Sequence, residues 1–211
     1  MIFVTGYHHS GTTIMQHSLL LALNISTSTR FSEEKPNGNT KLPVIKYPLY
    51  ESIARMNSMK NDIEKYAHVV VYMTRDKPNT VWSLVKRYNK ITPDAAQKWS
   101  KDFCEKTAWW KAQHFRVPVI NIHIVNFTLA SDKVMRYILQ VHDENKKIKT
   151  NTNHSGRRLK STNTIYSFPK DVDHNKLRIH QIHSNISTPD LNTYHKECKN
   201  IYIVSELLKE C

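Results

Sequence analysis

Short apolar runs along the chain alternate with longer stretches in which apolar residues recur at helical spacing. The runs typical of strands are residues 2–5, 42–48, 67–74 and 117–127. Helical spacing marks residues 12–23, 49–66, 75–90, 93–114, 130–142 and 189–211. Strands that alternate with helices of this length favour a parallel sheet that is covered on both faces. We therefore expect an α/β fold with three layers, in which helices flank a central parallel sheet.

The strongest strand signal is AHVVVYMT, residues 67–74. A continuous run of β-branched residues suits a parallel strand that is buried on both faces. Residues 145–167 are instead polar, basic and irregular, and they predict a mobile loop. Trp109 and Trp110 fall in an expected helix, so at least one of them should belong to the core. The length suits a single domain, which we expect to span residues 1–211.

Composition narrows the class of protein. Hydrophobic residues make up 39% and charged residues 23% of the chain, which is ordinary for a globular protein. No apolar run approaches the roughly 20 residues that a membrane span requires. Because the chain opens directly on a strand-like run, we expect no targeting segment and a cytoplasmic protein. Cys104, Cys198 and Cys211 are widely spaced, and we expect them to be reduced, partly buried thiols.

The formal net charge of +13 favours a polyanionic partner. Nucleic acid, a sulfated or phosphorylated substrate and a multiply charged cofactor all satisfy that condition. The charge is spread along the chain, with small clusters only at residues 144–149 and 155–160. Such spreading is more typical of a solvated surface than of a nucleic-acid reader, so it argues against nucleic acid. We expect no metal site, and no pattern indicates an oligomeric state.

The segment GYHHSGTTIM, residues 6–15, joins the first expected strand to the first expected helix. Gly6 and Gly11 frame a turn between them, and such a turn directs backbone N–H groups and the positive end of the helix dipole at one point. Thr12 and Thr13 add hydroxyl donors at the start of the helix. We interpret the segment as an anion site. The alternative is an ordinary strand-to-helix turn in which threonine caps the helix.

The same segment has the glycine spacing of a Walker phosphate loop, but Thr12 stands where that pattern has lysine. A nucleoside triphosphatase uses the lysine and a magnesium ion to neutralise the β and γ phosphates. A loop without the lysine is poorly equipped for that reaction. Another part of the chain must therefore supply the positive charge.

Two segments together resemble the sulfotransferases that use 3′-phosphoadenosine 5′-phosphosulfate (PAPS). GYHHSGTTIM resembles their 5′-phosphosulfate loop, commonly G-x-x-R/K-S-G-T-T, although His9 replaces the usual Arg or Lys. VVVYMTRDKPNTVWSLVKRY, residues 69–88, resembles their 3′-phosphate motif, with Ser83 eight positions after Arg75. The resemblance is most marked to the tyrosylprotein and Golgi-type carbohydrate sulfotransferases, in which a K-x-P element corresponds to Lys46. It implies a P-loop-NTPase-like fold.

The later part of the chain matches the family pattern less well. Residues 126–129 occupy the place of the family's Y-E-D-L element, but they read N-F-T-L and have no acidic residue. The resemblance covers residues 1–140 and extends only loosely beyond them.

The resemblance also implies roles for individual residues. His8, His9, Ser10, Gly11, Thr12 and Thr13 would bind the 5′ end of PAPS, Arg75 and Ser83 the 3′ phosphate, and Arg157 and Arg158 would close over the phosphates. Lys46, assisted by His9, would stabilise the leaving oxygen. Glu33 or Glu34 would be the base, with Glu34 preferred and His8 in reserve.

The expected reaction moves a sulfuryl group from PAPS to a hydroxyl, or an amine, of a carbohydrate, peptide or small molecule, and requires no metal. The product of the cofactor is adenosine 3′,5′-bisphosphate. Two alternatives remain open from the sequence. One is a P-loop nucleotide kinase or hydrolase with a degenerate Walker loop, and the other is a non-catalytic basic module that binds polyanions.

Overall fold

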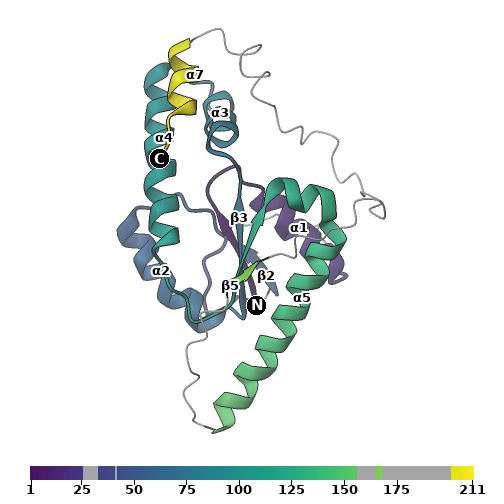
Figure 1. Ribbon diagram of the computed structural model, residues 1–211. Helices are drawn as coiled ribbons and strands as arrows, with labels where there is room; N and C mark the ends of the chain where they lie inside the picture. Colours follow the sequence, from purple (N-terminus) through teal and green to yellow (C-terminus); the bar gives the residue numbers. More distant parts are fainter. Residues whose placement is uncertain (26–32, 41, 156–164, 168–200) are drawn as a thin grey trace.

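The computed structural model describes residues 1–25, 33–40, 42–155, 165–167 and 201–211 (Figure 1). Its centre is a parallel sheet with the strand order β2-β1-β3-β4-β5. The strands are β1 (Ile2–Gly6), β2 (Val44–Lys46), β3 (Val69–Thr74), β4 (Val119–His123) and β5 (Ile165–Ser167). The helices are α1 (Thr12–Ala22), α2 (Ile53–Tyr66), α3 (Lys77–Arg87), α4 (Pro93–Lys111), α5 (Ile124–Ser155) and α7 (Ile201–Leu208). The expected α/β fold with a parallel sheet is confirmed.

Helices cover both faces of the sheet, with α1 and α5 on one side and α2 and α4 on the other (Figure 1). Alternate residues of a strand point to opposite faces. Ile2 and Val4 of β1 accordingly join the core against α1 and α5, whereas Phe3 joins the core against α2 and α4. All three side chains are fully buried. These two cores hold β1 in place, and the loop of residues 7–11 that follows β1 leads into α1.

Strand β3 lies at the centre of the sheet, between β1 and β4. Val69, Val70 and Val71 have no exposed surface, as the β-branched run predicts for a strand that is covered on both faces. Full burial of such a side chain contributes roughly 1.5–3 kcal/mol. Tyr72 stacks on Trp110 with ring centroids 4.3 Å apart. The prediction that one of the two adjacent tryptophans belongs to the core is therefore confirmed.

A third, smaller core joins α3, α4 and α7. Leu207 of α7 is buried against Val81, Trp82 and Val85 of α3 and Ala96 of α4. This packing fixes α3, which carries Ser83, from the side opposite the sheet (Figure 1).

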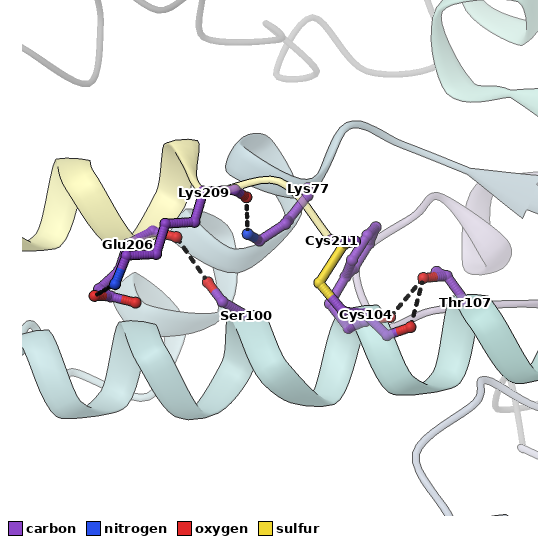
Figure 2. The surroundings of a disulfide bond; sticks show 8 residues. Lys77, Ser100, Cys104, Thr107, Glu206, Lys209 and Cys211 are labelled. Atoms are coloured by element: carbon purple, nitrogen blue, oxygen red, sulfur yellow. Dashed lines mark hydrogen bonds and ion pairs between the residues drawn. A yellow bond between two sulfur atoms is a disulfide. The ribbon is translucent and has the colours of Figure 1, made fainter.

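Cys104 of α4 and Cys211 form a disulfide that ties the end of the chain beyond α7 to α4 (Figure 2). The expectation that both are reduced thiols is thus wrong, because chain packing brings two residues 107 positions apart to a Cα separation of 5.2 Å. Beside the disulfide, Ser100 donates a hydrogen bond to the Glu206 carbonyl, and Lys77 donates one to the Lys209 carbonyl. Cys198 lies outside the described residues.

Two boundaries differ from the sequence prediction. Strand β4 ends at His123 and α5 begins at the next residue, so the second half of the expected strand at 117–127 is helical. Residues 145–155, expected as part of a mobile loop, continue α5. Lys149 anchors this part of α5, because its Nζ donates hydrogen bonds to the carbonyls of Glu64 in α2 and of Ala67 just after it. Among the described helices, none is both long and apolar enough to cross a membrane.

Candidate functional site

The loop between β1 and α1 is pressed tightly against the sheet. Gly6 has φ of 152° and Gly11 has φ of 97°, a region that side chains disfavour. A Cβ atom on Gly6 would lie 2.3 Å from the carbonyl oxygen of Met73, and one on Gly11 would lie 2.3 Å from Cδ1 of Ile124. Only glycine fits at either position. The loop is therefore a tight, fixed turn at the carboxyl end of β1.

Polar donors converge inside this turn. The first N–H groups of a helix have no partner within the helix. The N-cap residue of α1 is Gly11, so no side chain caps the first turn of this helix. Thr12, the first residue of the helix, is buried. Ser10 is 1% exposed, and its Oγ has no hydrogen-bond partner among the described residues. Because a buried hydroxyl without a partner is costly, this arrangement fits an anion that accepts from Ser10 and from the start of α1.

His9 connects the loop to α3. Its backbone has φ of 60°, which is uncommon for a residue other than glycine. Its Nδ1 lies 2.6 Å from Oγ of Ser83, and its Nε2 lies 3.2 Å from a guanidinium nitrogen of Arg87. Because the guanidinium can only donate, Nε2 must accept, and Nδ1 therefore carries the proton and donates to Ser83. The ring is neutral in this arrangement.

The electrostatic environment of His9 agrees with this tautomer. Burial, followed by the positive charge of Arg87, lowers the pKa of His9 to about 4. A histidine with this pKa carries no charge at neutral pH. In this arrangement His9 is therefore neutral, unlike the permanent cation that the related sequence pattern has at its position. Its ring instead connects Ser83 to a cation.

Two arginines supply positive charge beside His9. A guanidinium nitrogen of Arg75, which follows β3, donates to the carbonyl oxygen of His9 at 3.1 Å. The structure thus brings Arg75 and Ser83, expected together from sequence, to the same loop residue. Arg87 was missed by the sequence analysis. The sequence does contain a signal for Arg87, because this residue follows Ser83 by four positions and therefore lies on the same face of a helix.

Lys46 approaches the loop from the other side. Its Cα is in register with Val4 of β1, so the end of β2 lies beside the end of β1. The residue is 6% exposed, and its Nζ lies 2.9 Å from Oγ1 of Thr13 and 3.3 Å from Oε1 of Glu33. A buried ammonium group is stable only with such partners. The lysine is therefore held with its charge at the first turn of α1.

The two candidate carboxylates face different neighbours. Glu33 forms the ion pair with Lys46, and 41% of its side chain remains exposed. Glu34 instead accepts a hydrogen bond from the Thr40 hydroxyl at 3.1 Å, within its own loop. Its backbone N–H donates to the Lys46 carbonyl. Geometry therefore favours Glu33 over Glu34 as the carboxylate that acts together with Lys46.

A buried network supports the loop from α4. Tyr7 is 1% exposed, and its hydroxyl donates to Oδ2 of Asp102 at 2.6 Å. Lys106 pairs with the same carboxylate at 2.9 Å. Burial, followed by the charge of Lys106, lowers the pKa of the adjacent His8 to about 4. His8 is therefore neutral in this arrangement, and its expected roles in cofactor binding and as the reserve base stay predictions.

The remaining expected residues can be placed only in part. Arg157 and Arg158 lie outside the described residues. Within the described residues, no group of three or more His, Cys, Asp or Glu side chains could hold a metal ion.

No protein-family model matches the chain, and no curated protein matches it.

Proposed function

We propose that this protein is a sulfotransferase that uses PAPS and belongs structurally with the P-loop-like sulfotransferases. The observation that carries the proposal is that the two elements expected to bind phosphate meet at one residue. His9 belongs to the glycine-framed loop, and it contacts both Arg75 and Ser83 of the second element. A ligand that has two separate phosphate groups on one nucleotide would use both elements at once.

The residues present fit such a ligand. The buried Ser10 hydroxyl, which has no partner among the described residues, and the start of α1 provide donors for a 5′ phosphate. Gly6 and Gly11 let the turn pack directly against Met73 and Ile124, which fixes the positions of its backbone N–H groups. Arg75, Ser83 and Arg87 provide one hydroxyl and two guanidinium groups for a 3′ phosphate, a group that arginine binds well.

Lys46 and Glu33 complete the chemistry. When bound, PAPS supplies an activated sulfuryl group. The ammonium of Lys46, held at Thr13, would stabilise negative charge on the leaving oxygen. Glu33, which is partly exposed and close to Lys46, would take the proton from the acceptor hydroxyl. Ser10 to Thr13 would hold the 5′ end in place, since positioning is a large part of group-transfer catalysis.

A P-loop kinase or hydrolase is the enzymatic alternative, and one contact bears on it. In a Walker loop the hydroxyl at the position of Thr13 ligates magnesium. Here the Thr13 hydroxyl accepts a hydrogen bond from Lys46. The ammonium group of Lys46 therefore lies where the magnesium ion of a P-loop kinase would be bound. The contact favours a reaction that relies on a protein cation.

A thermal-shift experiment separates the two enzyme classes. We expect adenosine 3′,5′-bisphosphate, in the presence of EDTA, to raise the melting temperature, because a ligand at 100 times its Kd stabilises the native state by about 2.7 kcal/mol. Adenosine 5′-monophosphate, which lacks the 3′ phosphate, should give a smaller shift. Stabilisation by ATP with magnesium, and none by adenosine 3′,5′-bisphosphate, would favour the kinase.

The non-catalytic binding module is tested by Arg75→Ala. We expect this variant to lose the response to adenosine 3′,5′-bisphosphate, whereas Arg136→Ala, an exposed arginine on α5, should keep it. A basic module would instead bind polyanions with a steep salt dependence that neither variant changes.

A further inference from the structure

The disulfide between Cys104 and Cys211 is accessible in the folded protein. Cys211 is exposed, whereas Cys104 is partly buried on α4. Thiol–disulfide exchange begins when a thiolate attacks one sulfur of the bond, and exposed disulfides are the ones that reductants act on most readily. A reductant can therefore approach this bond from the side of Cys211 while the three cores stay intact.

The disulfide holds a short helix against two others. α7 has eight residues, and a helix of this length is not stable by itself in water. Its residue Leu207 is buried against α3 and α4. Ser100 of α4 donates a hydrogen bond to the carbonyl of Glu206 (Figure 2). Lys77 of α3 donates one to the carbonyl of Lys209. The cross-link keeps α7 at a high effective concentration beside these contacts, and that effect is lost when the bond is reduced.

α7 supports the helix that carries Ser83. Leu207 shares a small core with apolar residues of α3, among them Val81 and Val85, which are fully buried. Ser83 lies between these two positions in the helix, and its Oγ is 2.6 Å from Nδ1 of His9. One face of α3 thus packs on α7, while another contacts the loop after β1. Without α7, the helix loses the packing that holds Ser83 against this loop.

The other end of the disulfide lies on the turn of α4 that holds the same loop. Asp102 and Lys106 flank Cys104 and form an ion pair of 2.9 Å. The Tyr7 hydroxyl donates a hydrogen bond to Asp102 at 2.6 Å. The ring of Phe103 packs edge-on against Tyr7, with centroids 5.0 Å apart. The disulfide therefore ties α7 to the part of α4 that positions the first residue of the loop.

We propose that the bond between Cys104 and Cys211 is a redox switch for the nucleotide site. The oxidised form holds α7 against α3 and binds the nucleotide tightly, and the reduced form releases α7 and binds it weakly. The assignment rests on the PAPS-dependent function proposed above, which makes the contact between Ser83 and His9 part of a 3′-phosphate site.

The reductant of this switch is a dithiol. One of its thiolates attacks the sulfur of Cys211, which breaks the bond between the two cysteines and leaves Cys104 as a thiolate that takes up a proton. The second thiol of the reductant then attacks the mixed disulfide, so that Cys211 also becomes a thiol. The dithiol gives up two electrons and two protons and ends as a disulfide.

The two ends of the nucleotide should respond differently to reduction. The 3′ phosphate is expected to bind Arg75 and Ser83, and Ser83 loses its support when α7 leaves. The turn around Ser10 is held by the close packing of Gly6 and Gly11 against the sheet and α5, which α7 does not touch. Reduction should therefore weaken the binding of adenosine 3′,5′-bisphosphate more than that of adenosine 5′-monophosphate.

Isothermal titration calorimetry on the oxidised protein and on the protein reduced with dithiothreitol tests the switch. The Kd of adenosine 3′,5′-bisphosphate should rise about tenfold on reduction, which corresponds to about 1.4 kcal/mol, and should return on reoxidation. Cys211→Ser should bind as the reduced wild type does, with or without dithiothreitol. Cys198→Ser, which keeps the pair, is the matched control and should respond to reduction as the wild type does. Alkylation and mass spectrometry establish which cysteines are thiols in each sample.

Hydrogen exchange on the same samples distinguishes failure of the switch from failure of the proposed function. Reduction should speed exchange in α3 and α7 and leave β1 and β3 protected. The switch is overturned if exchange in α3 and α7 is the same in both states, or if both states bind the bisphosphate equally well. Loss of protection in β1 and β3 would also overturn it, because global unfolding would then explain the weaker binding. If neither state binds the nucleotide while α3 and α7 still respond to reduction, the release of α7 stands and the sulfotransferase assignment falls.

Discussion

His9 and Ser83, 74 positions apart, are joined by a hydrogen bond of 2.6 Å between Nδ1 and Oγ. The contact makes the loop after β1 and the first turns of α3 a single unit. It also determines the protonation of the histidine, because Arg87 occupies the other ring nitrogen. The positive charge at this position therefore belongs to Arg75 and Arg87, and the histidine positions them against the loop.

The neutral state of His9 predicts a pH dependence of stability. Its pKa is about 4 in the folded protein, below the ordinary value of 6.5, so the unfolded chain binds more protons between these values. Its contribution to stability is complete above pH 6.5 and is lost as the pH falls toward 4. Urea unfolding at several pH values should show a declining free energy of unfolding across this range.

The variant His9→Asn tests the contribution of this residue, because asparagine tolerates a positive φ. Its free energy of unfolding should decline less steeply than that of the wild type between pH 6.5 and 4.5. His8 and His68, whose pKa values burial also lowers to about 4, remain in both proteins and account for a residual slope. An identical slope in the variant would contradict the assignment of a neutral His9.

Lys46 is predicted to act on the reaction more than on binding. Replacement by methionine keeps the length of the side chain and removes the charge. With PAPS and an acceptor, Lys46→Met should lower kcat at least about 100-fold, since the loss of one group that stabilises transition-state charge costs about 2.7–4 kcal/mol. Affinity for adenosine 3′,5′-bisphosphate should change much less. Equal losses in kcat and affinity would reduce Lys46 to a binding residue, and Lys133→Met, at an exposed position on α5, is the control.

Glu33 and Glu34 form a natural matched pair. Glu33→Gln should lower kcat by about 100-fold or more, because general-base catalysis contributes typically 10²–10⁴-fold. Glu34→Gln should retain most of the activity, because its carboxylate bonds to Thr40 in its own loop. Steady-state kinetics on both variants decides between them. Loss of activity in Glu34→Gln alone would reverse the assignment.

The disulfide between Cys104 and Cys211 is predicted to stabilise the fold. Cys211→Ser should lower the free energy of unfolding by about 2–4 kcal/mol, since the bond closes a long loop in the unfolded chain. Dithiothreitol should destabilise the wild type by a similar amount and leave the variant unchanged. Mass spectrometry under non-reducing conditions checks the pairing, and a free thiol on both residues would contradict it.

The sequence was most informative where one interaction dominates. The run around Val70 requires burial on both faces, and the glycines at 6 and 11 are positions where no side chain fits, so both features could be predicted locally. The anchoring of α5 could not, because Lys149 contacts carbonyls of Glu64 and Ala67, which are more than 80 positions away. The pairing of Cys104 with Cys211 depends equally on distant packing.

In the candidate site, too, some features could be predicted from local sequence and others depend on distant packing. Arg75 and Ser83 have a local spacing that predicts convergence on the loop. The distinction between Glu33 and Glu34 has no local signal, because it depends on which of two adjacent side chains faces Lys46 across the sheet.

A crystal structure of the protein with adenosine 3′,5′-bisphosphate tests the central claim most directly. We predict that the 5′ phosphate lies in the loop with Ser10 Oγ within hydrogen-bond distance, and that the 3′ phosphate contacts Arg75 and Ser83. Lys46 should point toward the 5′ phosphate. A nucleotide bound elsewhere, or bound in the loop with its 3′ phosphate away from Arg75 and Ser83, would contradict the proposed function.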